Sequence, residues 1–488
     1  MCCKCCSETQ RKVWVFGSGV FIGVIALILV LGWPQWGEDI LESQLTLKEG
    51  SLMYDTWKET PIPIYLKFHL FNWTNSDQIS NPDVKPHFKE CGPYVFKEKH
   101  KRVKIQWNKN GTVSFNQIRT WQFDESQSGG SLDDVITSLN PITATVANMM
   151  RKEMDIFKEV INMLLNKKGG SLTITKTARE LLFDGYDDPL LTFIKKFNST
   201  AIDIPYDRFG WFVDRNNSDS FDGRFTIYNG QKDIKTMGLV DRWNGQNETE
   251  FFDGECGRIY GTTGELWPVK MDPVAPISVF VSDLCRSITL NYHDKYEAHG
   301  IEGSQWMGGD MVFDNGHLYE ENRCFCLEED FADCPPTGNL DISKCQLGAP
   351  ATMSYPHFYM ADPSYLNAVD GLSPNSTLHK FTIALHPETG IPLDLAARIQ
   401  LNMYSRQDSK IDIFKNVQNV LLPVFWFAQM VHLDSDLASQ VKLAILVPDL
   451  GLYISYGLFG VAAIIIIIGI ILTLTKSWVR TPKDQFEK

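Results

Sequence analysis

The sequence contains none of the common catalytic motifs. It has no nucleophile motif, no His/Glu metal-ligand cluster and no glycine-rich phosphate loop. These absences argue against a hydrolase, a metalloenzyme or a nucleotide-dependent enzyme. We therefore expect a protein that is not an enzyme and that uses no cofactor or metal ion.

Charge is absent from two long apolar stretches, and each is about as long as the roughly 20 residues that a helix needs to cross a bilayer. The first stretch ends in Trp33-Pro34-Gln35-Trp36 and has no small-residue cleavage site, so we expect a retained anchor. Basic residues flank both stretches on their outer sides, which places both termini in the cytosol. The expected order is tail, span, exterior domain, span and tail, at residues 1–12, 13–33, 34–451, 452–475 and 476–488.

Charge and cysteine content differ between the two sides of the membrane. The formal net charge is −13 although both tails are basic, so the exterior domain is acidic, which argues against nucleic acid as a partner. Four cysteines lie in the N-terminal tail, where adjacent cysteines would crowd a zinc site and S-palmitoylation is the more typical fate. We expect acylation of Cys2, Cys3, Cys5 and Cys6.

The exterior cysteines gather in one region, residues 256–345, and only Cys91 stands apart. An even number of cysteines in an oxidising compartment predicts three disulfides, but spacing alone leaves their connectivity open. We expect Cys91 to be a buried, inert thiol. The clustered residues are Cys256, Cys285, Cys324, Cys326, Cys334 and Cys345.

Asn-x-Ser/Thr sequons occur only in the predicted exterior domain. Each is a weak signal alone, but their placement agrees with the orientation that the basic flanks indicate. We expect N-glycosylation at Asn72, Asn110, Asn198, Asn216, Asn247 and Asn375.

Alternation of apolar and polar residues is the main pattern of the exterior domain. Residues 94–107 and 112–123 flank an Asn-Gly turn, and residues 381–385 and 393–403 flank a turn that contains Gly390. Alternation on both sides of a turn signal predicts antiparallel hairpins. We predict an α+β protein whose exterior domain is mainly antiparallel β-structure.

Residues 131–168 break this pattern and have helical periodicity. Ser131-Leu132-Asp133-Asp134 resembles a capping box, and apolar residues recur at spacings of three and four after Pro141. This apolar face either packs in the core or forms an adaptable ligand surface. Lys167 and Lys168 either lie in solvent at a helix C-terminus or attract a ligand. The apolar positions are Met150, Met154, Phe157, Ile161, Leu164 and Leu165.

Seven short blocks occur in order across nearly the whole exterior domain. They are GPY at 92–94, RELLFDGY at 179–186, SDLCRSI at 282–288, CFC at 324–326, LDISKC at 340–345, PHF at 356–358 and DGLSPN at 370–375. Together with the two spans, these blocks resemble the class B scavenger receptor family. That family includes the fatty-acid translocase, the high-density-lipoprotein receptor, the lysosomal integral membrane protein and the insect sensory neuron membrane proteins, and this chain is similar to its invertebrate members.

The resemblance implies a barrel-like exterior domain with an apical helical bundle, which includes residues 131–168, and an apolar tunnel that carries lipid toward the bilayer. It implies binding of lipid, lipoprotein or another anionic or protein ligand, with lipid transfer or endocytic uptake. Basic residues contact acidic ligands at the apex of relatives, which favours a ligand-binding role here for Lys167, Lys168, Met150, Met154, Phe157 and Ile161. By order in the chain, the family's disulfides become Cys256–Cys324, Cys285–Cys345 and Cys326–Cys334.

Three other features have both a structural and a functional interpretation. The basic run at 97–104 is either an edge strand protected by lysines or a second anion site, and we favour the edge strand. The Asp-rich run at 214–222 lacks the glycine and the closing glutamate of a calcium loop, so we expect a polar turn. Gly19 and Gly23 allow a close approach of the first span to the second span or to another chain in a homo-oligomer.

Two other classes of two-span membrane protein, a channel and an ectoenzyme, are alternatives to a lipid-handling receptor. A channel is disfavoured because the second span has no polar file to line a pore, and an ectoenzyme is disfavoured by the missing motifs. A receptor for protein cargo without lipid transfer stays an alternative. The C-terminal tail has no acidic dileucine and no tyrosine signal, so we expect the plasma membrane with endosomal cycling more than lysosomes.

Overall fold

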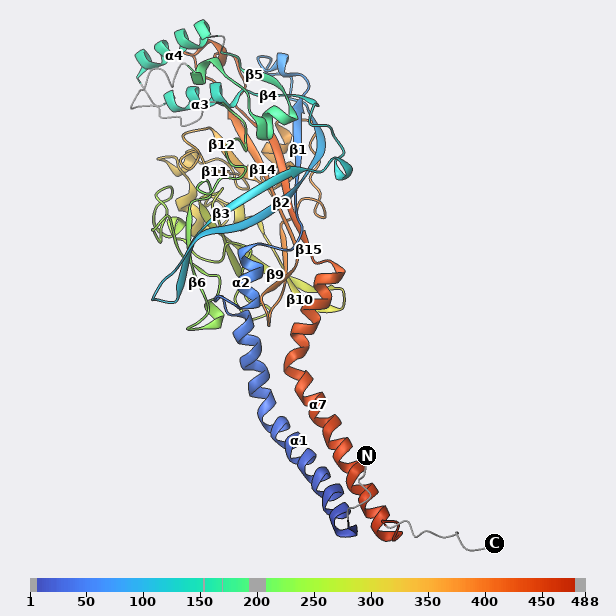
Figure 1. Ribbon diagram of the computed structural model, residues 1–488. Coiled ribbons are helices and arrows are strands. Elements are labelled where there is room, and N and C mark those ends of the chain that lie inside the picture. Colours follow the sequence, from blue (N-terminus) through green and yellow to red (C-terminus); the bar gives the residue numbers. More distant parts are fainter. Residues whose placement is uncertain (1–6, 152–153, 169, 193–207, 479–488) are drawn as a thin grey trace, which may run out of the picture. The chain divides into compact units, whose positions relative to one another are not determined.

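The computed structural model describes residues 7–151, 154–168, 170–192 and 208–478. The chain divides into two compact units. Unit 1 combines Met1–Leu45 with Asp436–Lys488, and unit 2 is Thr46–Ser435 (Figure 1). Unit 1 includes both predicted spans, and unit 2 is shorter than the predicted exterior domain of 34–451.

Unit 1 contains two long helices, α1 (Glu8–Leu45) and α7 (Ser435–Leu474). Both are long and apolar enough to cross a membrane. Each includes one predicted span and extends beyond it, with Pro34 inside α1 and Pro448 inside α7. The Nε1 atom of Trp33 donates a hydrogen bond to the carbonyl of Val447 at 3.3 Å, so the helices contact each other near these prolines.

The small residues of α1 face α7. A Cβ added to Gly19 would lie 2.8 Å from Cγ1 of Ile466, and one added to Gly23 would lie 3.8 Å from Cβ of Ala462. The glycine pair therefore allows the two helices of one chain to approach closely. Because α7 covers this face, a homo-oligomer through Gly19 and Gly23 receives no support from the structure.

Unit 2 is built on a 13-stranded antiparallel sheet, with the strands of its main path in the order β7-β6-β3-β2-β1-β15-β14-β13-β10-β9-β8. Two short strands, β11 (Leu340–Asp341) and β12 (Ala351–Ser354), are attached through β14. The strands of the main path are β1 (Ile64–Trp73), β2 (Phe88–Trp107), β3 (Thr112–Phe123), β6 (Arg224–Tyr228), β7 (Val240–Trp243), β8 (Ile277–Val281), β9 (Arg286–Ala298), β10 (Ile301–Met307), β13 (Thr382–His386), β14 (Ile391–Ser405) and β15 (Val420–His432). The short helices α2 (Leu52–Lys58) and α6 (Pro363–Asn367) also belong to unit 2.

The two ends of the strand path are joined through Gly261 and Thr262. The backbone N of Val240, in β7, donates to the carbonyl of Gly261, and the backbone N of Phe280, in β8, donates to the carbonyl of Thr262, both at 2.8 Å. Gly261 has φ +84°, and a Cβ there would lie 2.4 Å from the carbonyl group of Ser278. Only glycine permits this approach. The sheet is thereby nearly closed, as the predicted barrel-like fold requires.

The two predicted hairpins are confirmed. β2 and β3 pair on either side of Gly111, which has φ +86°, and β13 and β14 pair on either side of Gly390, which has φ +68°. Both turns need a residue that tolerates a positive φ.

The basic run at 97–104 lies between two strands only at its start. β1 pairs with β2 no further than Glu98, whereas β3 pairs with β2 along the run as far as Val103. On the β1 side, the residues from Lys99 onward have only the isolated bridge between Lys101 and Glu59 in the described structure. The edge-strand prediction is therefore wrong for Lys97 and Glu98 and right for most of the run. The alternation itself is real, because Lys97, Lys99 and Lys101 are exposed while their neighbours Glu98, His100 and Arg102 are buried. Lys104 leaves the alternation, since the register shifts after Val103.

A second sheet carries the helical segment. β4 (Val135–Leu139) pairs with β5 (Thr173–Thr177), and α3 (Pro141–Met150) and α4 (Asp155–Lys168) lie between them in the chain. Asn72, near the end of β1, accepts a hydrogen bond from the backbone N of Thr137 at 2.8 Å. The other end of β1 pairs with β15 at Ile64 and Val431, close to the residues where the chain enters and leaves unit 2. The helices therefore lie at the opposite end of unit 2 from these two points (Figure 1).

The predicted capping box is a turn. The backbone N of Ser131 donates to Oδ2 of Asp134 at 3.1 Å, and strand β4 follows. Asn140 caps α3 instead, because its Oδ1 accepts from the backbone N of Ile142 at 3.1 Å and Pro141 occupies the first turn. The predicted single helical segment is thus a strand followed by two helices.

Candidate ligand-binding surface

Helix α4 is held by a row of polar contacts on one side. Lys158 forms an ion pair with Asp408 at 3.1 Å, and the side-chain amides of Asn162 and Asn166 donate to Oδ2 of Asp412 at 2.9 and 3.1 Å. These three residues are spaced by four, so they form one side of the helix. The contacts fix the rotation of α4 about its own axis relative to the 408–412 loop.

The adjacent side of α4 packs into the core. Ile161 and Leu165 are buried and belong to the main hydrophobic cluster. Ile161 was predicted to contact ligand, but its position makes it a core residue. Met150 ends α3 and also packs against the core, whereas Met154 is 66% exposed. The side chains of Phe157 and Lys168 lie outside the described structure, so their predicted roles stay predictions.

A different row of apolar residues faces solvent. Ile156 is 64% exposed, Val160 46% and Met163 49%, and they are spaced by four and three residues. At 100° per residue these side chains and Lys167 fall on one face of the helix. We call Ile156, Val160, Met163 and Lys167 the α4 stripe. Sequence reasoning missed it, because α4 has two apolar rows and only packing shows which one is buried.

Lys167 completes the α4 stripe with a positive charge. It is exposed, and no carboxylate among the described residues pairs with it. It lies in the last turn, where the helix dipole also favours a cation. A row of three apolar side chains that ends in a free ammonium group suits an amphipathic anion or an anionic particle surface.

Aromatic side chains fill the interior of the barrel toward the α3–α4 end. Phe68, in β1, is completely buried, and its ring centroid lies 4.9 Å from that of Phe212, 5.8 Å from Phe96 and 6.1 Å from Phe183. Other aromatic residues at the margin are only partly buried. These are Phe123, Phe183, Phe209, Trp211 and Phe427.

The inner face of β2 changes from aromatic to charged beyond Phe96. Glu98 and His100 are almost fully buried, and Oε1 of Glu98 lies 2.6 Å from Nε2 of His100. Glu265 contacts Nδ1 of His100 at 2.8 Å and pairs with Arg102. Burial would raise the pKa of Glu98, but His100 outweighs it and holds this pKa at about 2. Burial lowers the pKa of His100 itself.

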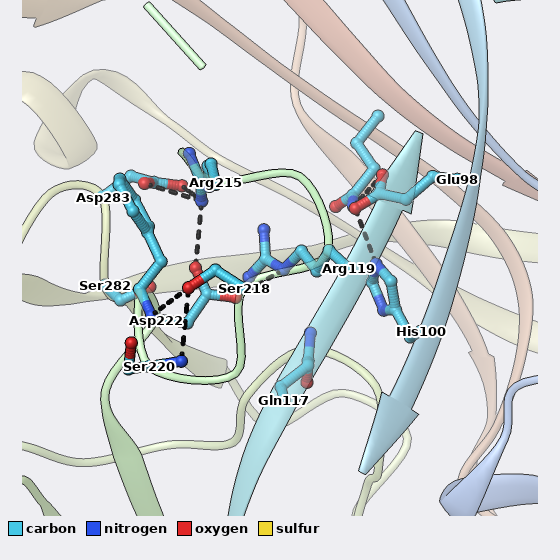
Figure 2. A network of polar contacts seen from close by, with 12 residues as sticks. Glu98, His100, Gln117, Arg119, Arg215, Ser218, Ser220, Asp222, Ser282 and Asp283 are labelled. Carbon is cyan, nitrogen blue, oxygen red and sulfur yellow. Dashed lines mark hydrogen bonds and ion pairs between the residues drawn. The ribbon is translucent and has the colours of Figure 1, made fainter. Parts of the chain in front are cut away.

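The same charged network continues to a second arginine centre. Arg215 lies 2.9 Å from Asp283 and 3.2 Å from Asp222, and Nε of Arg119 lies 2.8 Å from the other oxygen of Asp222 (Figure 2). Although burial opposes it, Asp283 and Asp222 raise the pKa of Arg215. The predicted polar turn at 214–222 therefore supplies two members of a buried ion network. Among the described residues, no group of His, Cys, Asp and Glu side chains is arranged to hold a metal ion.

The remaining predicted modification sites differ in accessibility. Asn110, Asn216, Asn247 and Asn375 are exposed. Asn72 is half-buried within β1 and already accepts the hydrogen bond from Thr137. Cys91 is a half-buried free thiol whose pKa is raised by burial. Asn198 and the four N-terminal cysteines, Cys2, Cys3, Cys5 and Cys6, lie outside the described residues.

Three disulfides staple the 256–345 region. They join Cys256 to Cys324, Cys285 to Cys345 and Cys326 to Cys334, which are the pairs that the family resemblance implied.

Two helices that could cross a membrane, a nearly closed barrel and a region with three disulfides together indicate a two-span membrane protein. A family model described as the CD36 family matches residues 15–473, and the chain belongs to this family. Protein peste of Drosophila melanogaster is 36% identical over 411 residues, which cover 84% of this chain and 73% of peste. Scavenger receptor class B member 1 of Cricetulus griseus is 32% identical over 472 residues, which cover 96% and 91%. Lysosome membrane protein 2 of Homo sapiens is 29% identical over 445 residues, which cover 90% and 89%.

Proposed function

We propose that this protein is a plasma-membrane receptor that captures a lipid-bearing anionic ligand on the α4 stripe. The proposal rests on the row of exposed apolar side chains at Ile156, Val160 and Met163 beside Lys167, which is exposed and has no carboxylate partner among the described residues. Exposed apolar rows on a helix typically mark binding surfaces. Membership of a family that includes scavenger receptors supports the same conclusion.

The partly buried aromatic residues are the proposed acceptor for the apolar part of the ligand. Phe183 borders the fully buried Phe68, and Trp211 and Phe209 extend the aromatic cluster from Phe425, which also contacts Phe68. An acyl chain or ring system would meet aromatic surface there. The charged residues Glu98 and His100 follow on the same inner face of β2. An apolar ligand that moves along this face must pass or avoid these two charged side chains. Transfer of the ligand through the barrel is therefore a separate step from its capture at the α4 stripe.

The exposed sequons support an exterior location of unit 2. We propose glycans at Asn110, Asn216, Asn247 and Asn375 and expect lower occupancy at Asn72, which lies within a strand. Acylation of the N-terminal cysteines and endosomal cycling remain part of this proposal.

Uptake by cells tests the capture surface. Val160→Asp should reduce uptake of a fluorescent anionic lipoprotein by about tenfold, because a carboxylate interrupts the apolar row and repels the ligand. Val274→Asp is the matched control, since Val274 is also exposed, at 57%, but lies on another element. Both variants are compared at equal surface expression. Equal uptake by the two variants would remove the α4 stripe from the mechanism.

A second readout separates capture from transfer. Lipoprotein carrying a fluorescent sterol ester and a labelled protein reports whether lipid enters cells without the particle. We expect selective lipid uptake. Entry of lipid and protein in a fixed ratio would show a cargo receptor that does not transfer lipid.

A further inference from the structure

A cavity of about 360 Å³ lies in the disulfide-stapled region and involves no residue of α4. Its buried lining residues include Arg286, Val312, Asn322 and Phe325, while Tyr260 and other lining residues are exposed. The volume is within the range of about 300 to 1,000 Å³ that is usual for small-molecule sites. Because buried and exposed side chains share its lining, the cavity is deep at one side and opens at the other.

Arg286 has hydrogen-bond donors that the protein does not use. A guanidinium group carries five N–H donors. Nε donates to the carbonyl of Ser287 at 3.1 Å, and Nη1 donates to the carbonyl of Val312 at 3.3 Å. Among the described residues, no acceptor bonds to Nη2 and no carboxylate forms an ion pair with Arg286. The unused donors belong to a side chain that lines the cavity.

The other buried arginines also have a donor without a hydrogen-bond partner, Nε in both Arg102 and Arg215, but each of them pairs with a carboxylate. Arg102 pairs with Glu265, and Arg215 pairs with Asp222 and Asp283. Arg286 is equally inaccessible, at 4% exposed, and burial lowers its pKa to about 9, so it is still charged at neutral pH. A buried cation without a partner is costly, and an anion in the cavity would relieve that cost.

The carboxylates nearby are already engaged. Glu255 lines the cavity but pairs with Arg258 at 2.8 Å. Burial, which lowers the pKa of Arg286, is the largest influence on it, while Tyr260 and after it Asp314 act in the opposite direction. The oxygens of Asp314 accept from Thr337 at 2.8 Å and from the backbone N of Gly316 at 3.0 Å. Glu321 is exposed at the opening. None of these groups therefore supplies the missing partner of Arg286.

The remaining walls suit an apolar group. The guanidinium carbon of Arg286 lies 3.4 Å from the centroid of the Phe325 ring, which leaves the edge of the planar group free. Met311, Val312 and the Cys256–Cys324 disulfide add apolar surface to the lining. A planar fork of donors beside apolar walls matches a carboxylate with a short carbon chain.

We propose that the Arg286 cavity is a binding site for a small organic carboxylate, whose anionic group bonds to the free guanidinium edge and whose carbon chain packs against Phe325, Val312 and Met311. The site is formed by other elements than the α4 stripe. It does not depend on the capture function proposed above.

Titration of the purified full-length protein in nanodiscs with sodium hexanoate tests this site. Hexanoate is short enough to stay largely in water, and calorimetry gives its dissociation constant. Arg286→Gln should weaken binding at least about tenfold, because it removes the charged donor fork. Met311→Phe should weaken it by a similar factor while Arg286 stays in place, because the larger side chain fills the cavity.

Arg242→Gln is the matched control, because Arg242 is exposed, pairs with Asp241 at 3.5 Å and does not line this cavity. The dissociation constant of this variant should stay within about threefold of wild type. Unchanged binding in both Arg286→Gln and Met311→Phe, or an equal loss in Arg242→Gln, would overturn the proposal. So would tighter binding of inorganic phosphate than of hexanoate, or no hexanoate binding at millimolar concentration. Lipoprotein uptake by the same variants should be normal, which separates this test from that of the α4 stripe.

Discussion

Arg215 and Arg286 are both buried arginines of unit 2, but their surroundings differ. Arg215 contacts two carboxylates and belongs to a network of internal ion pairs. Arg286 has two backbone carbonyls and an aromatic ring as partners and lines a cavity. The first environment is typical of a structural ion network, and the second is typical of a site whose partner comes from solution. Buried charge alone therefore does not point to a ligand site here, whereas a cavity beside an arginine that has no carboxylate partner among the described residues does.

The network around Arg215 should be the more sensitive to substitution. Arg215→Met leaves Asp222 and Asp283 without their shared partner and should lower the free energy of unfolding by about 3 to 5 kcal/mol. Arg286→Met leaves no carboxylate unpaired and should cost less than half as much. Urea unfolding of the full-length protein in nanodiscs, followed by tryptophan fluorescence, measures both. Equal losses would mean that Arg286 is as structural as Arg215.

The disulfides extend the comparison to the walls of the Arg286 cavity. Cys256–Cys324 closes a separation of 68 residues and lines the cavity, whereas Cys326–Cys334 closes one of 8. Replacing the first pair with serine should lower the free energy of unfolding by about 4 kcal/mol and the second by about 2.5 kcal/mol, since longer loops gain more entropy when opened. Only the first replacement should also weaken hexanoate binding. The reverse order of stability would contradict the loop-length argument.

A buried histidine cluster in unit 2 should make stability depend on pH. The ring of His379 stacks on that of His357 with centroids 4.5 Å apart, and its Nδ1 accepts from the backbone N of Asn375 at 3.0 Å. Burial, and after it the nearby His357, lowers the pKa of His379 to about 4. Glu90 acts in the opposite direction, and Arg398 and His69 add to the lowering.

The sign of the effect follows from proton binding. Between about pH 6.5 and 4 the unfolded chain binds a proton at His379 while the folded protein does not, so acidification favours unfolding. Stability should fall by about 2 kcal/mol from pH 7.5 to pH 5 through this group. His379→Gln should flatten that part of the pH profile, and His293→Gln, at an exposed position, should leave it unchanged. A profile that His379→Gln does not alter would exclude this histidine as the cause.

The sequence was sufficient for elements whose signals are local. The hairpin at Gly111 and that at Gly390 follow from alternation and a residue that accepts positive φ, and the two apolar helices follow from runs without charge. The disulfide pairs required the family resemblance, because spacing left them open. The prediction of the helical segment was only partly correct, because Ser131-Leu132-Asp133-Asp134 has the residues of a helix cap but forms a turn before β4.

The candidate sites depend on contacts between distant residues, which local patterns do not contain. Alternation in β2 showed two faces, yet only the packed structure shows that the face with Glu98, His100 and Arg102 is the buried one. The sequence does not show which of the two apolar rows of α4 is buried. The hydrogen bonds from Asn162 and Asn166 to the 408–412 loop fix the orientation of the helix and thereby decide it. Arg286 lies in the SDLCRSI block at 282–288, but the sequence does not show which residues surround it. Only the folded structure, with Val312 and Phe325 beside it, shows that no carboxylate among the described residues pairs with it.

The smallest effect is expected at Lys167, the charged end of the α4 stripe. Unlike Arg286, Lys167 is fully hydrated, so its charge contributes mainly to the rate of encounter with an anionic ligand and is screened within about 8 Å at physiological ionic strength. Lys167→Glu should slow association of an anionic lipoprotein by about threefold to tenfold at low salt, with little change in dissociation or in stability. Lys99→Glu, on the exposed face of β2, is the control for a general change in net charge. Surface plasmon resonance at several salt concentrations measures these rates. If Lys167→Glu changed the dissociation rate more than the association rate, Lys167 would make a desolvated contact with the ligand, and its role would resemble that of a buried charge.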